Sequence, residues 1–551
     1  KLRIIYVFLQ RKFTVTMIIT ELQQLYAAHP NVEGMCRLLK DNSVRHLYCS
    51  GLCASAASLF SSVLVQRAEC PFVFILGDLE EAGYFYHDLT QILGAERVLF
   101  FPSSFRRAIK YGQKDAANEI LRTEVLSRLQ KGEEGLCVVT CPDALAEKVV
   151  SRKELGDKTL KLHTGEKVDM DFVTEVLRSY GFEYVDYVYE PGQYAVRGSI
   201  IDVFSFSSEC PFRIDFFGDE VESIRTFEVE SQLSKEKKED IVIVPDLSRS
   251  LEQGGNGGMV SFLDFLRPDT LLAMRDFLWL RERIQAVHDE SLTAAAIAAR
   301  EAEENGAISL EGKLIDGGEF TLRALDFRRM EFGTKPTGTP DATVSFSTAA
   351  QPIFHKNFDL VAESFQDYLA RNYTLYICSD SLKQTDRIRA IFEDRGNNIS
   401  FTPVERTLHE GFADDTLRLC IFTDHQLFDR FHKYNLKSDK ARSGKVALSL
   451  KELNQFTPGD YVVHTDHGVG RFTGLVRIPN GDTTQEVMRL VYQNDDVVFV
   501  SIHSLHKVSK YKGKEGEAPR LNKLGTGAWE KLKDRTKTKI KDIARDLIKL
   551  Y

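Results

Sequence analysis

Residues 189–231 constrain the fold most strongly, because apolar and polar residues alternate along this stretch in several short runs. It reads YEPGQYAVRGSIIDVFSFSSECPFRIDFFGDEVESIRTFEVES, and Gly, Pro and Ser-Ser interrupt it. A period of two predicts strands, and the interruptions predict turns, so we expect an antiparallel meander. The best register gives two faces of three residues each: Phe212, Ile214 and Phe216 on the first, Arg213, Asp215 and Phe217 on the second. We predict that the first face is core. The second face, which combines an aromatic ring, an arginine and a carboxylate, is typical of an interaction hot spot.

The same stretch resembles a known sequence signature. The run EPGQYAVRGSIIDVF…PFRIDFFGDEVESIRTF is similar to the motif YxxRGxxxDvFP…yRieFFdDEIesIr, which two families of bacterial repair proteins share, UvrB and the transcription-repair coupling factor Mfd. A second run, PGDYVVHTDHGVGRFTG at residues 458–474, resembles the RNA-polymerase-interacting domain of Mfd and CarD-like proteins, which UvrB lacks. The two motifs in this order indicate the Mfd family.

The resemblance implies a binding site in the first motif. In both families this segment lies in a small domain that docks onto UvrA, and the family's contact positions correspond to Arg197, Arg213 and Phe217 in this sequence. Strand parity agrees for Arg213 and Phe217, but Gly198 could reset the register, so parity does not place Arg197. The alternative is structural. Arg213 would then form a salt bridge with Asp215 or a nearby acid, and the neighbouring domain would cover Phe217.

Length and net charge limit the number of domains and the kinds of partner that this chain can have. A chain of 551 residues is too long for one core and predicts three to five domains. The net charge of −8 argues against broad electrostatic binding of nucleic acid. The apolar run at residues 2–9 is too short to span a membrane, and we expect residues 1–16 to be an upstream or non-native extension. We therefore expect a soluble, cytoplasmic protein without membrane contact.

No metal site is predicted. The nine cysteines are scattered without a CxxC pair, which favours structural or incidental thiols in a reducing compartment. His464, Asp466 and His467 lie close together but lack a fourth ligand, so we interpret them as structural.

Strands alternate with helices in much of the chain, which predicts a mixed α/β multidomain protein with parallel sheets. In the first part we expect strands at 45–51, 71–78, 97–101 and 136–142, and helices at 55–66, 80–93 and 114–130. The predicted domains are 17–150 (first part of a UvrB-like α/β domain), 151–246 (inserted α+β domain that binds UvrA), 247–343 (second part of the α/β domain), 344–445 (a further α/β domain and a linker), 446–525 (a small SH3-like β-barrel) and 526–551 (a long helix).

The first strand-to-helix turn carries the sequence GLCASAAS, where an α/β protein of this type would hold a phosphate. It resembles a UvrB-type P-loop that has lost its chemistry, and the positions concerned are Gly51, Ala54 and Ala56 (glycine positions), Ala57 (lysine position) and Ser58 (hydroxyl position). A P-loop needs glycines for close backbone approach and a lysine to reach the phosphates. We therefore predict no ATP binding, no cofactor and no catalytic residue in this chain. The short stretch after residue 105 also leaves no room for the DNA-clamping hairpin of UvrB.

Short, evenly spaced strands predict an SH3-like barrel at 446–525. In the Mfd family this domain adds a strand to the RNA polymerase β subunit, a mode in which backbone hydrogen bonds provide affinity. Met488 and Leu490 share one strand face and are either polymerase contacts or barrel core. If the contact lies elsewhere, we expect it around Arg471 and Phe472.

As a whole, the resemblance implies an adaptor for nucleotide excision repair that binds stalled RNA polymerase through its β subunit and recruits UvrA. The chain ends within an amphipathic helical pattern, so we expect the native protein to continue. In the family an ATP-dependent DNA translocase motor follows, which would supply ATP and Mg²⁺ binding and most contacts with DNA. Two alternatives remain open: a UvrB-like DNA-dependent ATPase, and a CarD-like transcription regulator whose residues 17–250 bind no repair protein.

Overall fold

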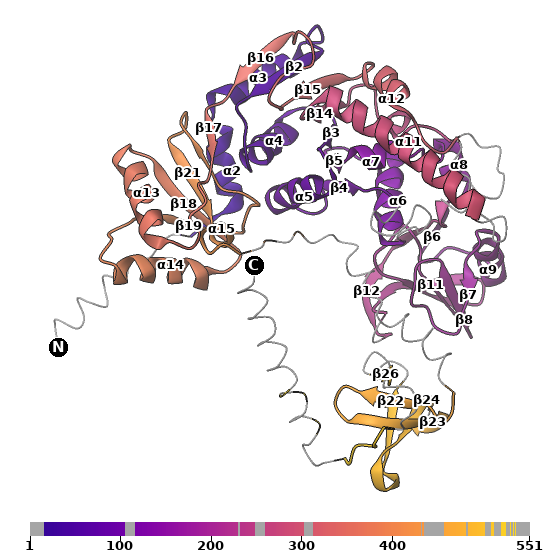
Figure 1. The fold of residues 1–551 in the computed structure, drawn as a ribbon. Coiled ribbons are helices and arrows are strands. Elements are labelled where there is room, and N and C mark those ends of the chain that lie inside the picture. Colours follow the sequence, from indigo (N-terminus) through magenta and orange to yellow (C-terminus); the bar gives the residue numbers. More distant parts are fainter. Residues whose placement is uncertain are drawn as a thin grey trace. The chain divides into compact units, whose positions relative to one another are not determined.

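The computed structural model describes most of the chain (Figure 1). The chain forms two compact units. The first unit comprises residues 1–160, 206–208 and 242–439, and the second comprises 161–205, 209–241 and 440–551. The described residues are 16–104, 116–229, 232–247, 259–301, 312–430, 432, 434, 457–480, 483–501, 508–511, 519–524, 529, 533 and 535.

A seven-stranded parallel sheet forms the centre of the first unit, with the strand order β16-β2-β15-β14-β3-β5-β4. Its strands are β2 (His46–Ser50), β3 (Phe72–Ile75), β4 (Val98–Phe101), β5 (Cys137–Thr140), β14 (Leu271–Met274), β15 (Arg328–Glu331) and β16 (Ala342–Ser345). Most of these strands are buried apolar runs, as expected for a parallel sheet covered on both faces. Strands from before and after the inserted segment thus belong to one sheet.

The helices of this sheet include all those expected from the alternating pattern. They are α2 (Ile19–Ala27), α3 (Pro30–Lys40), α4 (Ala56–Arg67), α5 (Leu79–Leu93), α6 (Ala116–Lys131), α7 (Pro142–Leu145), α8 (Arg152–Asp157), η1 (Phe262–Phe265), α11 (Phe277–Glu301) and α12 (Gly317–Ala324). Asp78 begins α5 as its N-cap, because its carboxylate accepts a hydrogen bond from the backbone N–H of Glu81 at 2.9 Å. None of the described helices is long and apolar enough to cross a membrane.

A second, six-stranded sheet lies in the same unit, with the strand order β1-β19-β18-β21-β20-β17. Its strands are β1 (Met17–Ile18), β17 (Thr348–Ala350), β18 (Thr374–Ser379), β19 (Thr402–Glu405), β20 (Phe412–Asp414) and β21 (Leu419–Thr423), and its helices are α13 (Phe358–Ala370), α14 (Leu382–Asp394) and α15 (Asp424–Leu427). Strand β1, which we had assigned to the first α/β domain, pairs in parallel with β19 and so extends the second sheet. One hydrophobic cluster contains side chains from both sheets, including Phe74 of β3 and Phe412 of β20.

In the second unit, the inserted segment forms the predicted meander, a six-stranded sheet with the order β12-β11-β10-β9-β8-β7. Its elements are α9 (Met170–Ser179), β7 (Glu183–Tyr184), β8 (Gln193–Arg197), β9 (Ile200–Val203), β10 (Phe212–Phe217), β11 (Glu220–Phe227) and β12 (Ser234–Lys238), and β6 (Leu160–His163) pairs with β13 (Asp240–Ile243). All pairs in the meander from β8 to β12 are antiparallel. Gly181, expected to stop α9, follows the helix with φ of 77°, where a glycine is favoured.

The C-terminal module of the second unit is a five-stranded antiparallel sheet with the order β25-β24-β23-β22-β26. Its elements are β22 (Tyr461–His464), β23 (Gly468–Asn480), β24 (Thr483–Val491), η2 (Gln493–Asp495), β25 (Val497–Ser501) and β26 (Val508–Lys510). Its core contains Val462, Phe472, Met488, Leu490, Tyr492, Val500 and Val508. Three earlier predictions fall on residues outside the described ranges: the extension before residue 16, the missing hairpin after residue 104, and nearly all of the helix at 526–551.

Candidate functional site

The exposed face of the inserted sheet is the first candidate site. Strand β10 alternates as predicted, since Phe212, Ile214 and Phe216 are buried whereas Arg213 and Phe217 lie on the opposite face. Phe217 is 78% exposed, and Gly218, with φ of 64°, begins the tight turn that follows it. An aromatic ring so exposed at a hairpin tip is available to a partner.

Arg213 is held rather than free. Its Nε donates to Oδ1 of Asp202 at 2.7 Å, one terminal nitrogen donates to Oδ2 at 2.9 Å, and the other donates to the carbonyl of Gln232 at 3.1 Å. The guanidinium also lies 4.5 Å from the ring centre of Phe227. This two-pronged geometry fixes the arginine in one orientation, with a side chain that is only 15% exposed.

Arg197 meets the same carboxylate. Its terminal nitrogen donates to Oδ2 of Asp202, and its guanidinium lies over Tyr187 at 5.2 Å. Arg197 is paired with Ile200 of β9, two residues before Asp202. Its side chain therefore lies on the same face of the sheet as that of Asp202, which strand parity alone could not show. The side chain of Asp202 is 1% exposed, so two arginines share one buried carboxylate.

The structure therefore brings Arg197 and Arg213 together. Phe217 lies four residues after Arg213 along β10, roughly 13 Å from it at the usual rise per residue of a strand. A salt bridge from Arg213 to a nearby acid does exist, but the acid is Asp202 rather than Asp215. Sequence reasoning missed Asp202. The signal was available, because Asp202 stands between the buried residues Ile201 and Val203 and must therefore face the opposite side.

The turn at 51–58 is the second candidate site. Gly51 has φ of 77°, and a Cβ there would lie 2.0 Å from the carbonyl oxygen of Phe346, so only glycine fits. Ala54 adopts φ of 48°, which is unusual for a residue with a side chain. The backbone N–H of Cys53 donates to the hydroxyl of Thr348 at 3.1 Å. At least one N–H of this turn is thus already occupied by the protein itself.

A buried carboxylate lies against the first turn of α4. The hydroxyl of Ser58 donates to Oδ2 of Asp88 at 2.8 Å, and the backbone N–H of His409 donates to Oδ1 at 2.7 Å. Complete burial raises the pKa of Asp88 to about 6, against the opposing effect of its hydrogen bonds. Ala57, at the lysine position of the predicted loop, is buried as well.

A cavity of about 360 Å³ opens beside this carboxylate. Its lining contains Ala54, Ser55, Ala57, Ser58, Asp78, Glu80, Glu81, Tyr84, Phe85, Asp88, Arg275, His409 and Glu410. Five of these residues are acidic, and Arg275 is already paired with Glu81 at 2.7 Å. Because like charges repel, such a lining disfavours a phosphate.

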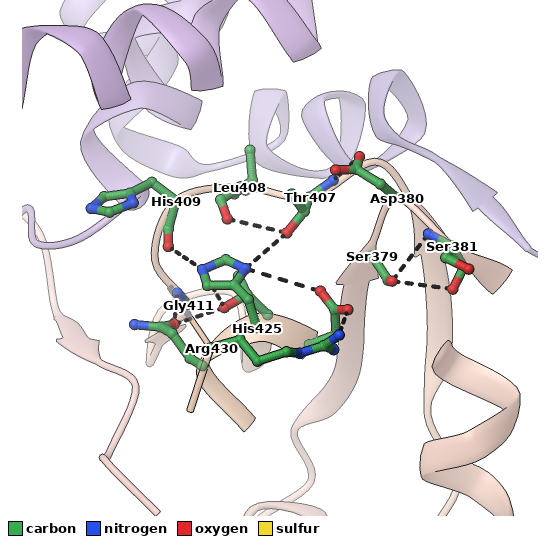
Figure 2. Close-up of polar contacts among 12 residues, drawn as sticks. Ser379, Asp380, Ser381, Thr407, Leu408, His409, Gly411, His425 and Arg430 are labelled. Carbon is green, nitrogen blue, oxygen red and sulfur yellow. Dashed lines mark hydrogen bonds and ion pairs between the residues drawn. The ribbon is translucent and has the colours of Figure 1, made fainter. Parts of the chain in front are cut away.

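The loop that carries His409 connects β19 to β20 of the second sheet (Figure 2), and its backbone contacts Asp88 of α5. The ring of His425 contacts the carbonyl of His409 at 2.8 Å, and the backbone N–H of Thr407 donates to Asp380 at 3.2 Å. His409 itself stacks on Tyr84 of α5, with ring centres 3.5 Å apart. Burial lowers the pKa of His409, His425 and the nearby His87 to about 4. These histidines are neutral at physiological pH and serve the packing of this loop.

The C-terminal module corrects one prediction. Met488 and Leu490 are fully buried in its core, so the core alternative applies and neither side chain presents a contact surface. Phe472 is also core, whereas Arg471 is exposed. The reason is that both side chains lie on the face of β24 that packs against the core of the module, whereas Arg489 between them lies on the opposite, exposed face.

Two exposed residues of this module lie on or next to an outer strand. Among the described strands β25 and β26 are the outer ones, and Phe499 of β25 is 50% exposed. Phe499 is directly opposite Arg489 of β24, which is exposed too. Sequence reasoning missed this pair, because strand order is not visible in the pattern.

Among the residues that the structure describes, no group of His, Cys, Asp or Glu side chains is placed to hold a metal ion. The ring of His464 is instead engaged locally, since its Nδ1 accepts a hydrogen bond from the backbone N–H of Asp466 at 3.1 Å. Its ring also stacks on His467, with ring centres 4.6 Å apart.

Comparison with known proteins identifies both modules of the second unit. The UvrB interaction domain family matches residues 160–248, and the CarD-like/TRCF RID domain family matches residues 456–512. The transcription-repair-coupling factor of Bacillus subtilis is 24% identical over 573 residues, covering 91% of this chain and 48% of that protein. The proteins of the same name from Staphylococcus aureus strains RF122 and USA300 are each 25% identical over 582 residues, with the same coverage.

The chain spans about half the length of the curated relatives it matches. The first family match covers the sheet that carries Arg197, Asp202 and Arg213, and the second covers the five-stranded module. We conclude that this chain is similar to the transcription-repair-coupling factors over 91% of its length, and that it matches both the UvrB interaction domain and the CarD-like/TRCF RID domain.

Proposed function

We propose that this chain is an adaptor in transcription-coupled repair, which binds UvrA through its inserted domain and the RNA polymerase β subunit through its C-terminal module. The observation that carries this proposal is the presence of both matched domains in one chain, the first with a surface of arginines and an exposed aromatic ring. Relatives named as transcription-repair-coupling factors support the same role.

For UvrA, the proposed contact residues are Arg197, Arg213 and Phe217. Arginine and aromatic side chains are enriched among residues that dominate binding energy. Phe217 offers an apolar anchor, whereas the two arginines are oriented in advance by Asp202, which lowers the entropy cost of binding. Asp202 neutralises only one of their two charges, so the pair suits an acidic partner surface.

For RNA polymerase, the proposed contact is the outer strand β25 of a small SH3-like barrel. A free strand edge can add a partner strand through backbone hydrogen bonds, and neighbouring side chains then select the partner. Phe499 and Arg489 flank this edge and are exposed, and Arg471 lies exposed on β23. Met488 and Leu490 contribute to this site only by supporting the sheet.

We also propose that the turn at 51–58 is a P-loop of the UvrB type that no longer binds nucleotide, so that this part of the chain acts as a scaffold. Support comes from Ala57 at the lysine position and from the acidic cavity beside Asp88. An ATPase role is disfavoured for the same reasons.

The proposal is tested with Phe217→Ala and Phe499→Ala in the 551-residue chain. Binding to purified UvrA and to RNA polymerase is measured for each variant. We expect Phe217→Ala to weaken UvrA binding at least tenfold and to leave polymerase binding unchanged, and Phe499→Ala to do the reverse, so each variant is the control of the other. Failure of the unaltered chain to bind either partner would refute the adaptor function.

A further inference from the structure

A row of cationic side chains crosses the exposed face of the inserted sheet. Arg213 on β10 is directly opposite Arg225 on β11, and Arg225 is directly opposite Lys237 on β12. Like charges directly opposite each other on neighbouring strands are destabilising. Buried Asp202 compensates Arg213 at one end of this row, but it already serves Arg197 as well.

Arg225, in the middle of the row, is only partly satisfied. One of its terminal nitrogens approaches Asp215 at 3.4 Å and the hydroxyl of Ser223 at 3.1 Å. Its Nε is closed to solvent, yet no described residue offers it an acceptor. The side chain is nevertheless 35% exposed, so its terminal N–H groups, unlike Nε, can reach an acceptor supplied by a partner.

The position of Arg225 places it within the proposed docking face. It shares the face of Arg213 and Phe217, and its side chain is 35% exposed, close to the 37% of Arg197. Asp215 lies between Arg213 and Phe217 along β10, and its carboxylate lies 3.4 Å from a terminal nitrogen of Arg225.

We infer that Arg225 is a further contact residue for UvrA, positioned by Asp215, and that it receives a carboxylate from the partner. This inference rests on the proposed function. Charge complementarity carries it: three arginines and Lys237 outnumber the carboxylates of Asp202, Asp215 and Glu220 on this face, whereas the chain as a whole has a net charge of −8. A guanidinium binds a carboxylate through two parallel hydrogen bonds, which a lysine cannot reproduce.

The test uses Arg225→Ala, Arg225→Lys and Arg178→Ala in the full chain. Arg178 is an exposed arginine of α9 in the same domain and serves as the matched control. Affinity for purified UvrA is measured by calorimetry, and thermal unfolding checks the fold. We expect Arg225→Ala to raise Kd about tenfold or more. Arg225→Lys should lose several-fold because it keeps only the charge, and Arg178→Ala should bind like the unaltered chain.

The outcomes separate this inference from the proposed function. If Arg213→Ala weakens UvrA binding while both Arg225 variants bind normally, Arg225 is not a contact and only this inference fails. If Arg225→Ala fails to fold, Arg225→Lys decides the question. A loss of affinity for a double-stranded DNA oligonucleotide with unchanged UvrA affinity would assign the row to nucleic acid and overturn the inference. An unaltered chain that does not bind UvrA refutes the proposed function itself.

Discussion

Replacing Asp88 by asparagine should stabilise the first unit at neutral pH. Asp88 is completely buried, and burial raises its pKa from 3.8 to about 6. The native state therefore holds the proton more tightly than the unfolded state. The stabilising contribution of the protonated carboxyl is fully present below pH 3.8 and is lost as the pH rises through about 6.

The magnitude follows from the size of the shift. Each pKa unit corresponds to about 1.4 kcal/mol, so the ionised carboxylate costs about 3 kcal/mol above pH 6 relative to a group that cannot ionise. An asparagine side chain keeps an oxygen for the backbone N–H of His409, and its amide can donate to the hydroxyl of Ser58. Because bonds to an amide oxygen are weaker than bonds to a carboxylate, we expect a net gain of about 1–3 kcal/mol at about pH 7.5.

Trp279 provides the assay. The chain has two tryptophans, and Trp279 lies in the first unit beside Gly77. In a Trp529→Phe background, its fluorescence reports urea unfolding of this unit alone. The free energy of unfolding is compared between the unaltered chain and the Asp88→Asn variant from about pH 4.5 to about pH 7.5, and the difference should shrink steadily as the pH falls.

Neighbouring histidines titrate in the same range with the opposite sign. Burial lowers the pKa of His87, His409 and His425 to about 4, so their stabilising contribution is present above pH 6.5 and lost as the pH falls toward 4. This loss is common to both proteins and cancels in the difference. Asp78→Asn is the matched control, since asparagine caps a helix as well as aspartate does. A destabilised Asp88→Asn variant, or a difference independent of pH, would refute the reasoning.

Three further predictions concern the remaining sites. Met488→Arg places an unpaired charge in the core of the C-terminal module, and it should lower the stability of that module by about 4 kcal/mol or more, seen as loss of its folded NMR signals. Asp202→Ala leaves two partly exposed arginines without their shared acceptor, and it should cost about 2–3 kcal/mol in urea unfolding of the inserted domain and weaken UvrA binding. The chain should show no saturable binding of a fluorescent ATP analogue, and saturable binding that disappears on substitution of Ser58 would contradict the assignment of the turn as inactive.

Local patterns in the sequence were sufficient for most elements. The alternation around Phe212, Ile214 and Phe216 gave the correct core face of β10, and the helices and strands between residues 45 and 142 formed as expected. Such features depend on a backbone period and on nearby capping residues, which the sequence displays directly.

Features that depend on long-range strand pairing and packing could not be predicted from the sequence. Strand parity shows that Met488 and Leu490 share a face, but not that this face is the core, because that depends on which face of β24 packs against side chains from the other strands. Likewise, nothing local shows that the first described strand, β1, pairs with β19.

The sequence by itself predicted a docking face of arginines and an aromatic ring, and a loop without the glycines and the lysine of a nucleotide site. Only the tertiary structure decided how those residues are used. It brings Arg197 and Arg213 onto the single carboxylate of Asp202, and it joins Asp88 to His409 across 321 residues. The physical reason is that periodicity fixes the direction of a side chain relative to its own strand or helix, whereas its partners are fixed by long-range packing and by the need to satisfy buried polar groups.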